Sequence, residues 1–161
     1  FIVRKKKMAV IQGDFKQVHG KVAIVVSRFN ELVTKSLATG AAETLLKFGI
    51  KEEDIDTYWV PGAFELGFAA KKLVDSGKYD GIMTLGAVIK GETDHYAMII
   101  SNVTSAVMEL NLAGKVPVTF GMLTTENIDQ ALQRSGLKVG NEGSATAQSL
   151  LEMMSLQEKI G

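Results

Sequence analysis

The sequence predicts an α/β fold, a three-layer α/β/α sandwich around a central, mostly parallel four-stranded sheet. Short apolar runs rich in β-branched residues alternate along the chain with longer segments that repeat apolar residues at helical spacing. The run at residues 21–26 is short, apolar and rich in β-branched residues, as a strand buried on both faces is. A chain of 161 residues without a linker, an internal repeat or a low-complexity stretch fits one domain.

Four strands are expected, each ending at polar or chain-breaking residues. They cover residues 21–26, 55–60, 81–89 and 116–123. Pro117 lies near the start of the fourth, where the missing backbone donor is tolerated. A further short strand could precede them at residues 9–12.

Helices are expected between and after the strands, because apolar residues recur there every three or four positions. The first follows Asn30, a plausible N-cap, and ends at Gly49. The second covers residues 65–76 and stops at Gly77. The others cover residues 94–112, residues 127–133 and a final stretch from 141 or 143 through 154 toward 157.

Composition excludes several classes of function. Lys plus Arg and Asp plus Glu both number 18, so the basic excess typical of nucleic-acid binding is absent. Without cysteine there is no disulfide, thiolate metal site or cysteine nucleophile, which is compatible with the cytoplasm. His19 and His95 are too few and too far apart to suggest a metal site. No apolar run is long enough to span a membrane.

Residues 1–7 lack a starting Met and the apolar core of a signal peptide, and Met8 is a more natural start. We therefore expect residues 1–7 to be an N-terminal extension or an expression remnant. The single domain would then cover residues 8–161.

The strand ends are the expected place for a ligand, because parallel sheets of this kind bind ligands at the carboxyl ends of their strands. Four turns there are rich in polar, aromatic and glycine residues: Ser27-Arg28-Phe29-Asn30, Val60-Pro61-Gly62-Ala63-Phe64-Glu65, Lys90-Gly91-Glu92-Thr93-Asp94-His95 and Leu123-Thr124-Thr125-Glu126-Asn127. The chain has no Walker loop, dinucleotide-binding glycine motif or serine nucleophile elbow, so nucleotide cofactors and serine hydrolysis lack support.

The turn from Gly91 to His95 leads from a strand into a helix. Free N–H groups at a helix start favour an anion such as phosphate, although an ordinary helix capped by Thr93 or Asp94 would look the same. His95 could accept and donate a proton near neutral pH, or it could be a plain surface or core histidine.

Other candidate residues are ambiguous by themselves. Phe29 and Phe64 could stack on a planar heterocycle or cover the edge of the core. Glu65 could bind ligand hydroxyls or simply favour a helix N-terminus. Arg134 could bind a phosphate with two hydrogen bonds, or it could be solvated.

The order and spacing of these residues along residues 11–154 resemble the lumazine synthase family. The resemblance rests on the first three turns above, on residues 117–127, and on Arg134 followed by Gly140-Asn141-Glu142-Gly143. It implies a flavodoxin-like fold and a transferase that uses no metal or organic cofactor. The implied reaction condenses 5-amino-6-(ribitylamino)uracil with 3,4-dihydroxy-2-butanone 4-phosphate to 6,7-dimethyl-8-ribityllumazine, the step before riboflavin.

The resemblance also implies roles for individual residues. His95 would be the catalytic proton-transfer residue. The substrates would be bound by Phe29, Ala63, Phe64, Glu65, Val88, Ile89, Lys90, Phe120 and Lys138, and the phosphate by Gly91, Glu92, Thr93 and Arg134. Phe120, Arg134 and Lys138 would come from a neighbouring subunit of a homo-pentamer. An insertion associated with free pentamers is lacking between the last two helices, which favours an icosahedral shell of pentamers.

Three residues depart from the family pattern. Ala97 stands where an acidic residue usually follows His95-Tyr96, so the histidine would lack a carboxylate partner. Glu142 stands where many members have a second lysine, which reverses the local charge. Gly67 replaces a frequent proline and could loosen the start of its helix.

Three alternatives remain beside this resemblance. An archaeal-type riboflavin synthase has a similar fold, but the set of Phe29, His95 and Arg134 argues against it. A non-catalytic flavin- or lumazine-binding shell protein is favoured only by Ala97 and Glu142. A signalling domain of the response-regulator type would need acidic residues after the first strand, where this chain has none.

Overall fold

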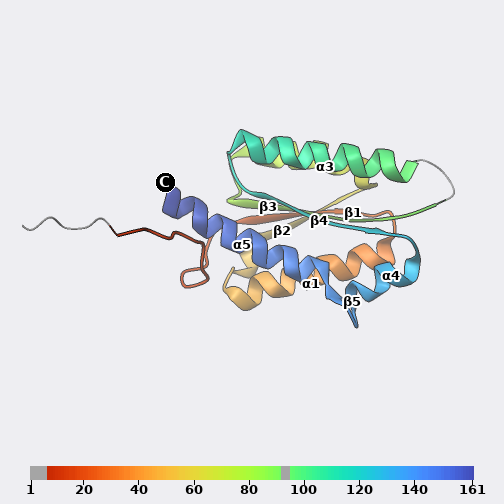
Figure 1. The fold of residues 1–161 in the computed structure, drawn as a ribbon, viewed down its shortest axis with the longest axis horizontal. Helices are drawn as coiled ribbons and strands as arrows, with labels where there is room; N and C mark the ends of the chain where they lie inside the picture. The colour runs from red at the N-terminus through yellow and green to blue at the C-terminus, as the bar shows by residue number, and fades with distance from the viewer. Residues whose placement is uncertain (1–6, 92–94) are drawn as a thin grey trace, which may run out of the picture.

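Four parallel strands form the central sheet of this computed structural model, which describes residues 7–91 and 95–161 (Figure 1). The strands are β1 (Val22–Ser27), β2 (Ile55–Val60), β3 (Gly81–Ile89) and β4 (Val118–Thr125). Their order in the sheet is β2-β1-β3-β4. The predicted α/β class is confirmed, and so is the parallel four-stranded sheet.

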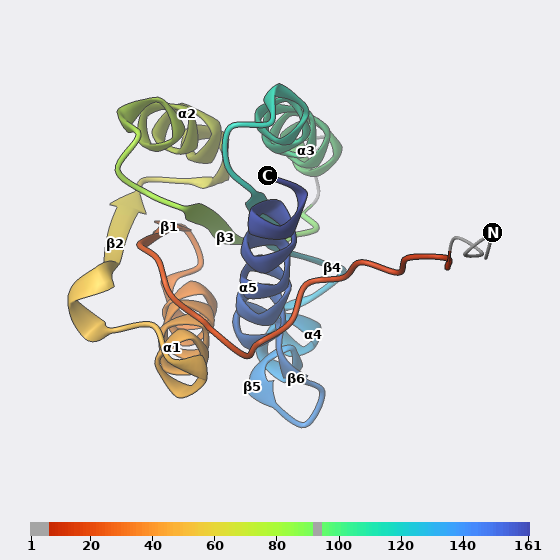
Figure 2. The same cartoon turned by 90° about the vertical axis from the view of Figure 1, so that its left-hand side faces the viewer.

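Helices cover both faces of the sheet (Figure 2). One face carries α2 (Leu66–Ser76) and α3 (His95–Ala113), and the other carries α1 (Glu31–Phe48), α4 (Ile128–Gln133) and α5 (Glu142–Ile160). Strand β1 is buried along its whole length. Its side chains alternate between the two cores, with Val22, Ile24 and Val26 toward α1 and α5, and Ala23 and Val25 toward α2 and α3. Two short 3-10 turns, Glu52–Asp54 and Ala63–Glu65, flank β2.

The strand order places a topological switch point between β1 and β3. Val22 pairs with Ile55 of β2 on one side and with Gly81 of β3 on the other. From β1 the chain moves outward to β2 and then returns across β1 to β3 and β4. A crevice is expected where this reversal occurs, outside the carboxyl ends of β1 and β3.

Two of the predicted helix ends are confirmed. Gly49 and Gly77 both adopt the left-handed conformation, with φ of 117° and 69°. The N–H of Gly49 donates to the carbonyl groups of Leu45 and Leu46, which would otherwise be unpaired at the end of the helix. Glycine is favoured at both positions because it has no Cβ to clash.

The structure differs from the prediction in two places. Residues 9–12 form no strand within the chain, because this segment leads along α5 and not along an edge of the sheet. Asp14 N donates to Ser155 Oγ at 3.0 Å, and Lys159 Nζ lies 2.6 Å from Asp14 Oδ2. A hairpin of β5 (Ser135–Leu137) and β6 (Gly140–Asn141) was not predicted.

None of the described helices is long and apolar enough to cross a membrane.

Candidate active site

An open cleft of about 510 Å³ lies at the switch point, between the carboxyl ends of the strands and the start of α3. Eight of the residues predicted for the site line it: Phe29, Ala63, Phe64, Glu65, Val88, Ile89, Gly91 and His95. They come from three strand ends and one helix, and residues 29 and 95 are far apart in the sequence. The fold therefore brings together most of the predicted site residues.

Two aromatic side chains stand at the mouth of the cleft. Phe29 is 71% exposed although it follows the buried strand β1, and Phe64, which follows the partly exposed strand β2, is 68% exposed. The backbone around Phe29 is held in place, because Arg28 N donates to Val60 O at 2.7 Å and Phe29 N donates to Pro61 O at 3.1 Å. A solvent-exposed aromatic ring on this held backbone, beside an apolar floor, offers a stacking surface for a planar ligand.

The floor of the cleft is apolar and the rim carries one carboxylate. Val88 is buried at 8% exposure, Ile89 is half-buried, and Ala63 packs into the same core as Val88. Glu65 is exposed at the end of the Ala63–Glu65 turn, where its N–H donates to Gly62 O at 3.2 Å. A carboxylate at that position can accept hydrogen bonds from ligand hydroxyl groups.

His95 is exposed, begins α3 and faces the cleft together with Tyr96 and Ile99. Gly91 lies at the other end of the turn that leads from β3 into α3. A Cβ added at Gly91 would meet no atom within 4 Å, so the backbone there is open to a ligand. Glu92 and Thr93, predicted for phosphate binding, lie outside the described residues. The structure therefore places only the two ends of the proposed phosphate-binding turn.

Four predicted residues do not line this cleft. Lys90 points elsewhere, because its ammonium lies 3.5 Å from the carboxylate of Glu126 at the end of β4. Phe120 lies on the edge strand β4 at 36% exposure, Arg134 follows α4 and Lys138 lies in the turn between β5 and β6. The side chain of Arg134 is exposed, and its Nη1 donates to Gln130 O at 3.1 Å. The side chain of Lys90 is therefore directed away from the cleft of its own chain, and its role in substrate binding stays a prediction.

Five further residues line the cleft that were not assigned to the site from the sequence: Pro61, Gly62, Ala87, Tyr96 and Ile99. Pro61 and Gly62 belong to the polar and aromatic turn at residues 60–65, which was predicted to lie at a strand end. Tyr96 and Ile99 could have been found from helical spacing, because positions 95, 96 and 99 share one side of a helix. Ala87 carried no sequence signal, because nothing distinguishes it from the other buried residues of its strand.

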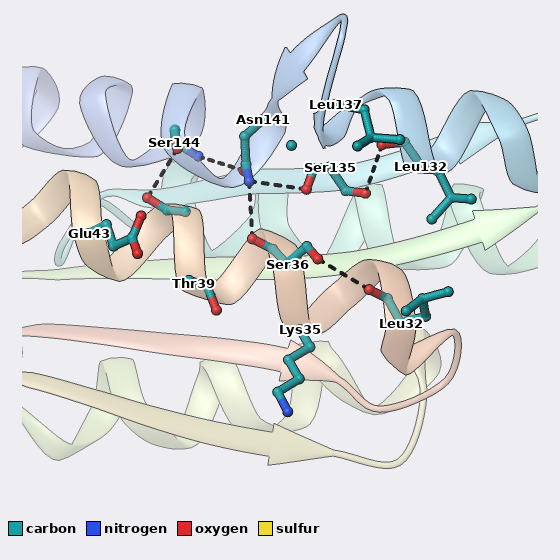
Figure 3. Close-up of a pocket in the computed structure, with 12 residues that line it drawn as sticks. Leu32, Lys35, Ser36, Thr39, Glu43, Leu132, Ser135, Leu137, Asn141 and Ser144 are labelled. Carbon is teal, nitrogen blue, oxygen red and sulfur yellow. Dashed lines mark hydrogen bonds between the residues drawn. The ribbon is translucent and has the colours of Figure 1, made fainter.

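A second cavity, of about 670 Å³, lies between α1 and the β5–β6 hairpin (Figure 3). Several of its polar groups already bond one another. Asn141 Nδ2 donates to Ser36 O at 3.0 Å and Ser144 Oγ donates to Gly40 O at 3.1 Å, so these groups hold α5 and the hairpin against α1. None of the described residues that line it is aromatic or histidine. This cavity fits a structural junction better than a site for a heterocycle.

The departures from the family pattern have different surroundings. Ala97 is exposed on α3, two residues after His95. Glu142 is the first residue of α5, following the N-cap Asn141, whose side chain accepts a hydrogen bond from Ser144 N at 3.1 Å. The acidic side chain of Glu142 at this position interacts favourably with the helix dipole. At the start of α2, a Cβ on Gly67 would lie 3.0 Å from Ala106 on α3, so close packing accounts for the small residue.

Comparisons with known proteins agree with this architecture. A family model described as 6,7-dimethyl-8-ribityllumazine synthase matches residues 19–158. A protein of that name from Limosilactobacillus reuteri (strain DSM 20016) is 58% identical over 153 residues, covering 95% of this chain and 99% of the relative. Another from Pediococcus pentosaceus is 53% identical over 148 residues, covering 92% and 95%.

A third relative with the same name, from Leuconostoc mesenteroides subsp. mesenteroides, is 50% identical over 144 residues, covering 89% of this chain and 92% of the relative. These similarities do not favour an archaeal-type riboflavin synthase or a non-catalytic shell protein. With matches of this extent, the chain belongs to the 6,7-dimethyl-8-ribityllumazine synthase family.

Proposed function

We propose that this protein is a transferase that condenses 5-amino-6-(ribitylamino)uracil with 3,4-dihydroxy-2-butanone 4-phosphate to form 6,7-dimethyl-8-ribityllumazine, in riboflavin biosynthesis. The observation that carries the proposal is the cleft at the switch point, where exposed Phe29, Glu65 and His95 surround an apolar floor. The catalytic domain would cover residues 8–161, and the protein would act in the cytoplasm.

The cleft has the chemistry that a ribityl-pyrimidine requires. Phe29 would stack on the ring, and Val88 and Ile89 would cover its other side or its edge with apolar surface and backbone groups. Glu65 would accept hydrogen bonds from the hydroxyl groups of the ribityl chain. Ala63 and Phe64 would complete the wall from the end of β2.

The phosphate substrate would lie at the start of α3. Gly91, Glu92 and Thr93 would bind the phosphate through the turn, where helix N–H groups and the dipole favour an anion. Arg134 would supply the opposite charge from a neighbouring subunit, with Phe120 and Lys138 beside it. The exposed positions of these three residues outside the cleft of their own chain support this arrangement.

An active site shared in this way would exist only in an oligomer. We therefore propose a homo-pentamer, assembled further into an icosahedral shell of pentamers. The short connection of residues 134–141 between α4 and α5 supports the shell, since it carries only the small β5–β6 hairpin.

The reaction needs proton transfer but no metal or organic cofactor. The amine of the pyrimidine attacks the ketone and loses water to form an imine, elimination then releases inorganic phosphate, and ring closure releases a second water. His95 would transfer protons at these steps, which typically contributes about 10²–10⁴-fold. Holding both substrates in reacting geometry can contribute up to about 7–11 kcal/mol, so we expect binding to matter more than His95.

The test is lumazine formation from purified protein and the two substrates without added metal, followed by absorbance or fluorescence. We expect product, and we expect it to vanish in Arg134→Ala when the phosphate substrate is scarce. A folded oligomer that binds riboflavin but forms no product would overturn the proposal. That outcome would point to the non-catalytic alternative, with Ala97 and Glu142 as the first positions to revert.

A further inference from the structure

The turn from β1 to α1 contains a residue in an unusual backbone conformation. Among the described residues, Asn30 is the only non-glycine residue with a positive φ, at φ 63° and ψ 46°. This left-handed region is unfavourable for residues with a Cβ, although asparagine tolerates it better than most. Such conformations persist where the surrounding structure enforces them, and they cluster at functional sites.

The side chain of Asn30 does not cap the helix that follows it. Asn30 is at the N-cap of α1, and its carbonyl oxygen accepts hydrogen bonds from Val33 N and Thr34 N at 3.0 Å each. Its side chain makes no capping bond. Instead, Asn30 Nδ2 donates to Ala87 O on β3 at 2.9 Å. The amide group therefore ties this turn to the neighbouring strand and not to its own helix.

Phe29 is held between two strand ends as a result. On one side its own N–H donates to Pro61 O after β2, and on the other side Asn30 binds Ala87 O near the end of β3. Pro61 and Ala87 both line the cleft. Because the ring of Phe29 is 71% exposed, little side-chain packing fixes it, and the backbone contacts must set its position.

We propose that Asn30 is a positioning residue for the substrate ring, acting through Phe29. Its left-handed backbone and its bond to Ala87 O set the separation between the stacking face of Phe29 and the floor that begins at Val88. The inference rests on the proposed function, because it assumes that Phe29 stacks on a planar substrate.

Three substitutions separate the backbone role from the hydrogen bond. Asn30→Gly keeps access to positive φ but removes the amide, so it should fold and should lower the melting temperature less than Asn30→Ala does. Asn30→Asp keeps the shape but sets a carboxylate oxygen against Ala87 O, which cannot donate. Asn30→Ala removes the amide and also disfavours the backbone conformation, so it should lower the melting temperature as well.

The readouts are the dissociation constant of 6,7-dimethyl-8-ribityllumazine by fluorescence titration, KM for each substrate, kcat and melting temperature. For Asn30→Gly we expect the dissociation constant and KM of the pyrimidine to rise about 3- to 10-fold, the range for one lost hydrogen bond. KM of the phosphate substrate and kcat should stay within about 2-fold of the unchanged protein. Asn30→Asp should weaken pyrimidine binding at least as much.

The role of Phe29 as intermediary is tested by a double-mutant cycle. If Asn30 acts through Phe29, then Asn30→Gly should have no further effect on pyrimidine binding in a Phe29→Ala background. Equal effects in both backgrounds would overturn the inference, as would unchanged binding and KM in Asn30→Gly alone. Unchanged protein that neither binds the lumazine nor forms it would instead overturn the proposed function itself.

Discussion

Gly143 of α5 packs directly against the carbonyl oxygen of Leu37 on α1, so closely that a Cβ at position 143 would overlap that oxygen. The same crossing brings Gly40 of α1 against the side chain of Asn141. The two helices therefore meet backbone to backbone on the face of the sheet opposite the α2–α3 layer. This contact holds the last helix, and with it the hairpin that follows Arg134, against the core.

Gly143→Ala is therefore expected to destabilise the protein, because the added methyl group forces the two helices apart. Overpacking of a tight contact typically costs about 1–3 kcal/mol. The change would be measured as a lower midpoint of urea unfolding. Gly67→Ala is the control, since its Cβ would meet only the methyl group of Ala106, and its midpoint should change less. Equal midpoints for Gly143→Ala and the unchanged protein would contradict this account.

Asp75 predicts a pH dependence of stability. Hydrogen bonds from Lys71 and Lys115 lower the pKa of its carboxyl group from 3.8 to about 2. The bond from Lys71 lies within α2, and the bond from Lys115 joins α2 to the turn before β4. Because the pKa is depressed in the folded state, the contribution to stability is full above pH 3.8 and is lost as the pH falls toward about 2.

Asp75→Asn should accordingly unfold at lower urea concentrations than the unchanged protein at pH 7, and the difference should shrink between pH 4 and pH 2. The Lys71→Met/Lys115→Met double variant is the matched control, in which the aspartate-to-asparagine change should have little effect at either pH. A difference in unfolding midpoint that stays constant down to pH 2 would argue against the ion pairs as its cause.

Most of the fold was predictable because its elements have strong local signals. The apolar runs of β1 and β3 are long enough to identify, and Gly49 and Gly77 end helices at positions that require positive φ. The β5–β6 hairpin was missed because strands of three and two residues are too short to show alternation. Residues 9–12 look like a strand locally, but no sheet edge of this chain lies beside them.

The candidate site was predictable where it depends on strand ends alone. Phe29, Phe64 and His95 follow three different elements, and the rule for parallel sheets places all three at the same edge. The partners of Lys90 and Asn30 could not be predicted, because Glu126 and Ala87 become neighbours only through the order of strands in the sheet. The functional roles assigned to the site residues stay predictions.

Glu142 offers a test of one departure from the family pattern. Its acidic side chain favours the N-terminus of α5, and its N–H donates to Arg134 O at 2.9 Å, so the position adjoins the proposed phosphate-binding arginine. Glu142→Lys should lower the free energy of unfolding by about 1 kcal/mol and also lower KM for the phosphate substrate. For Glu142→Gln, the free energy of unfolding and the KM for the phosphate substrate should both lie between those of the unchanged protein and Glu142→Lys. A KM that rises with the lysine would contradict the proposed location of the phosphate.

Phe29→Ala tests the stacking surface. Stacking of a nucleobase on an aromatic side chain is worth about 1–3 kcal/mol, so KM for the pyrimidine should rise about 5- to 150-fold. The melting temperature should hardly change, because the ring is mostly exposed. Leu32→Ala is the control, since Leu32 is 72% exposed on α1 and lines the other cavity. Comparable losses of pyrimidine affinity in both variants would count against a specific role for Phe29.

His95→Ala distinguishes proton transfer from substrate positioning. The cleft still holds both substrates in this variant, so we expect kcat to fall by up to about 10²–10⁴-fold while product formation stays above the rate of the uncatalysed mixture. Pyrimidine affinity should be nearly unchanged. His19→Ala is the matched control, because His19 pairs with Glu158 at 3.0 Å near the end of α5 and should leave kcat intact. A His95→Ala protein that binds both substrates normally but shows no turnover would mean that proton transfer, and not positioning, dominates the rate.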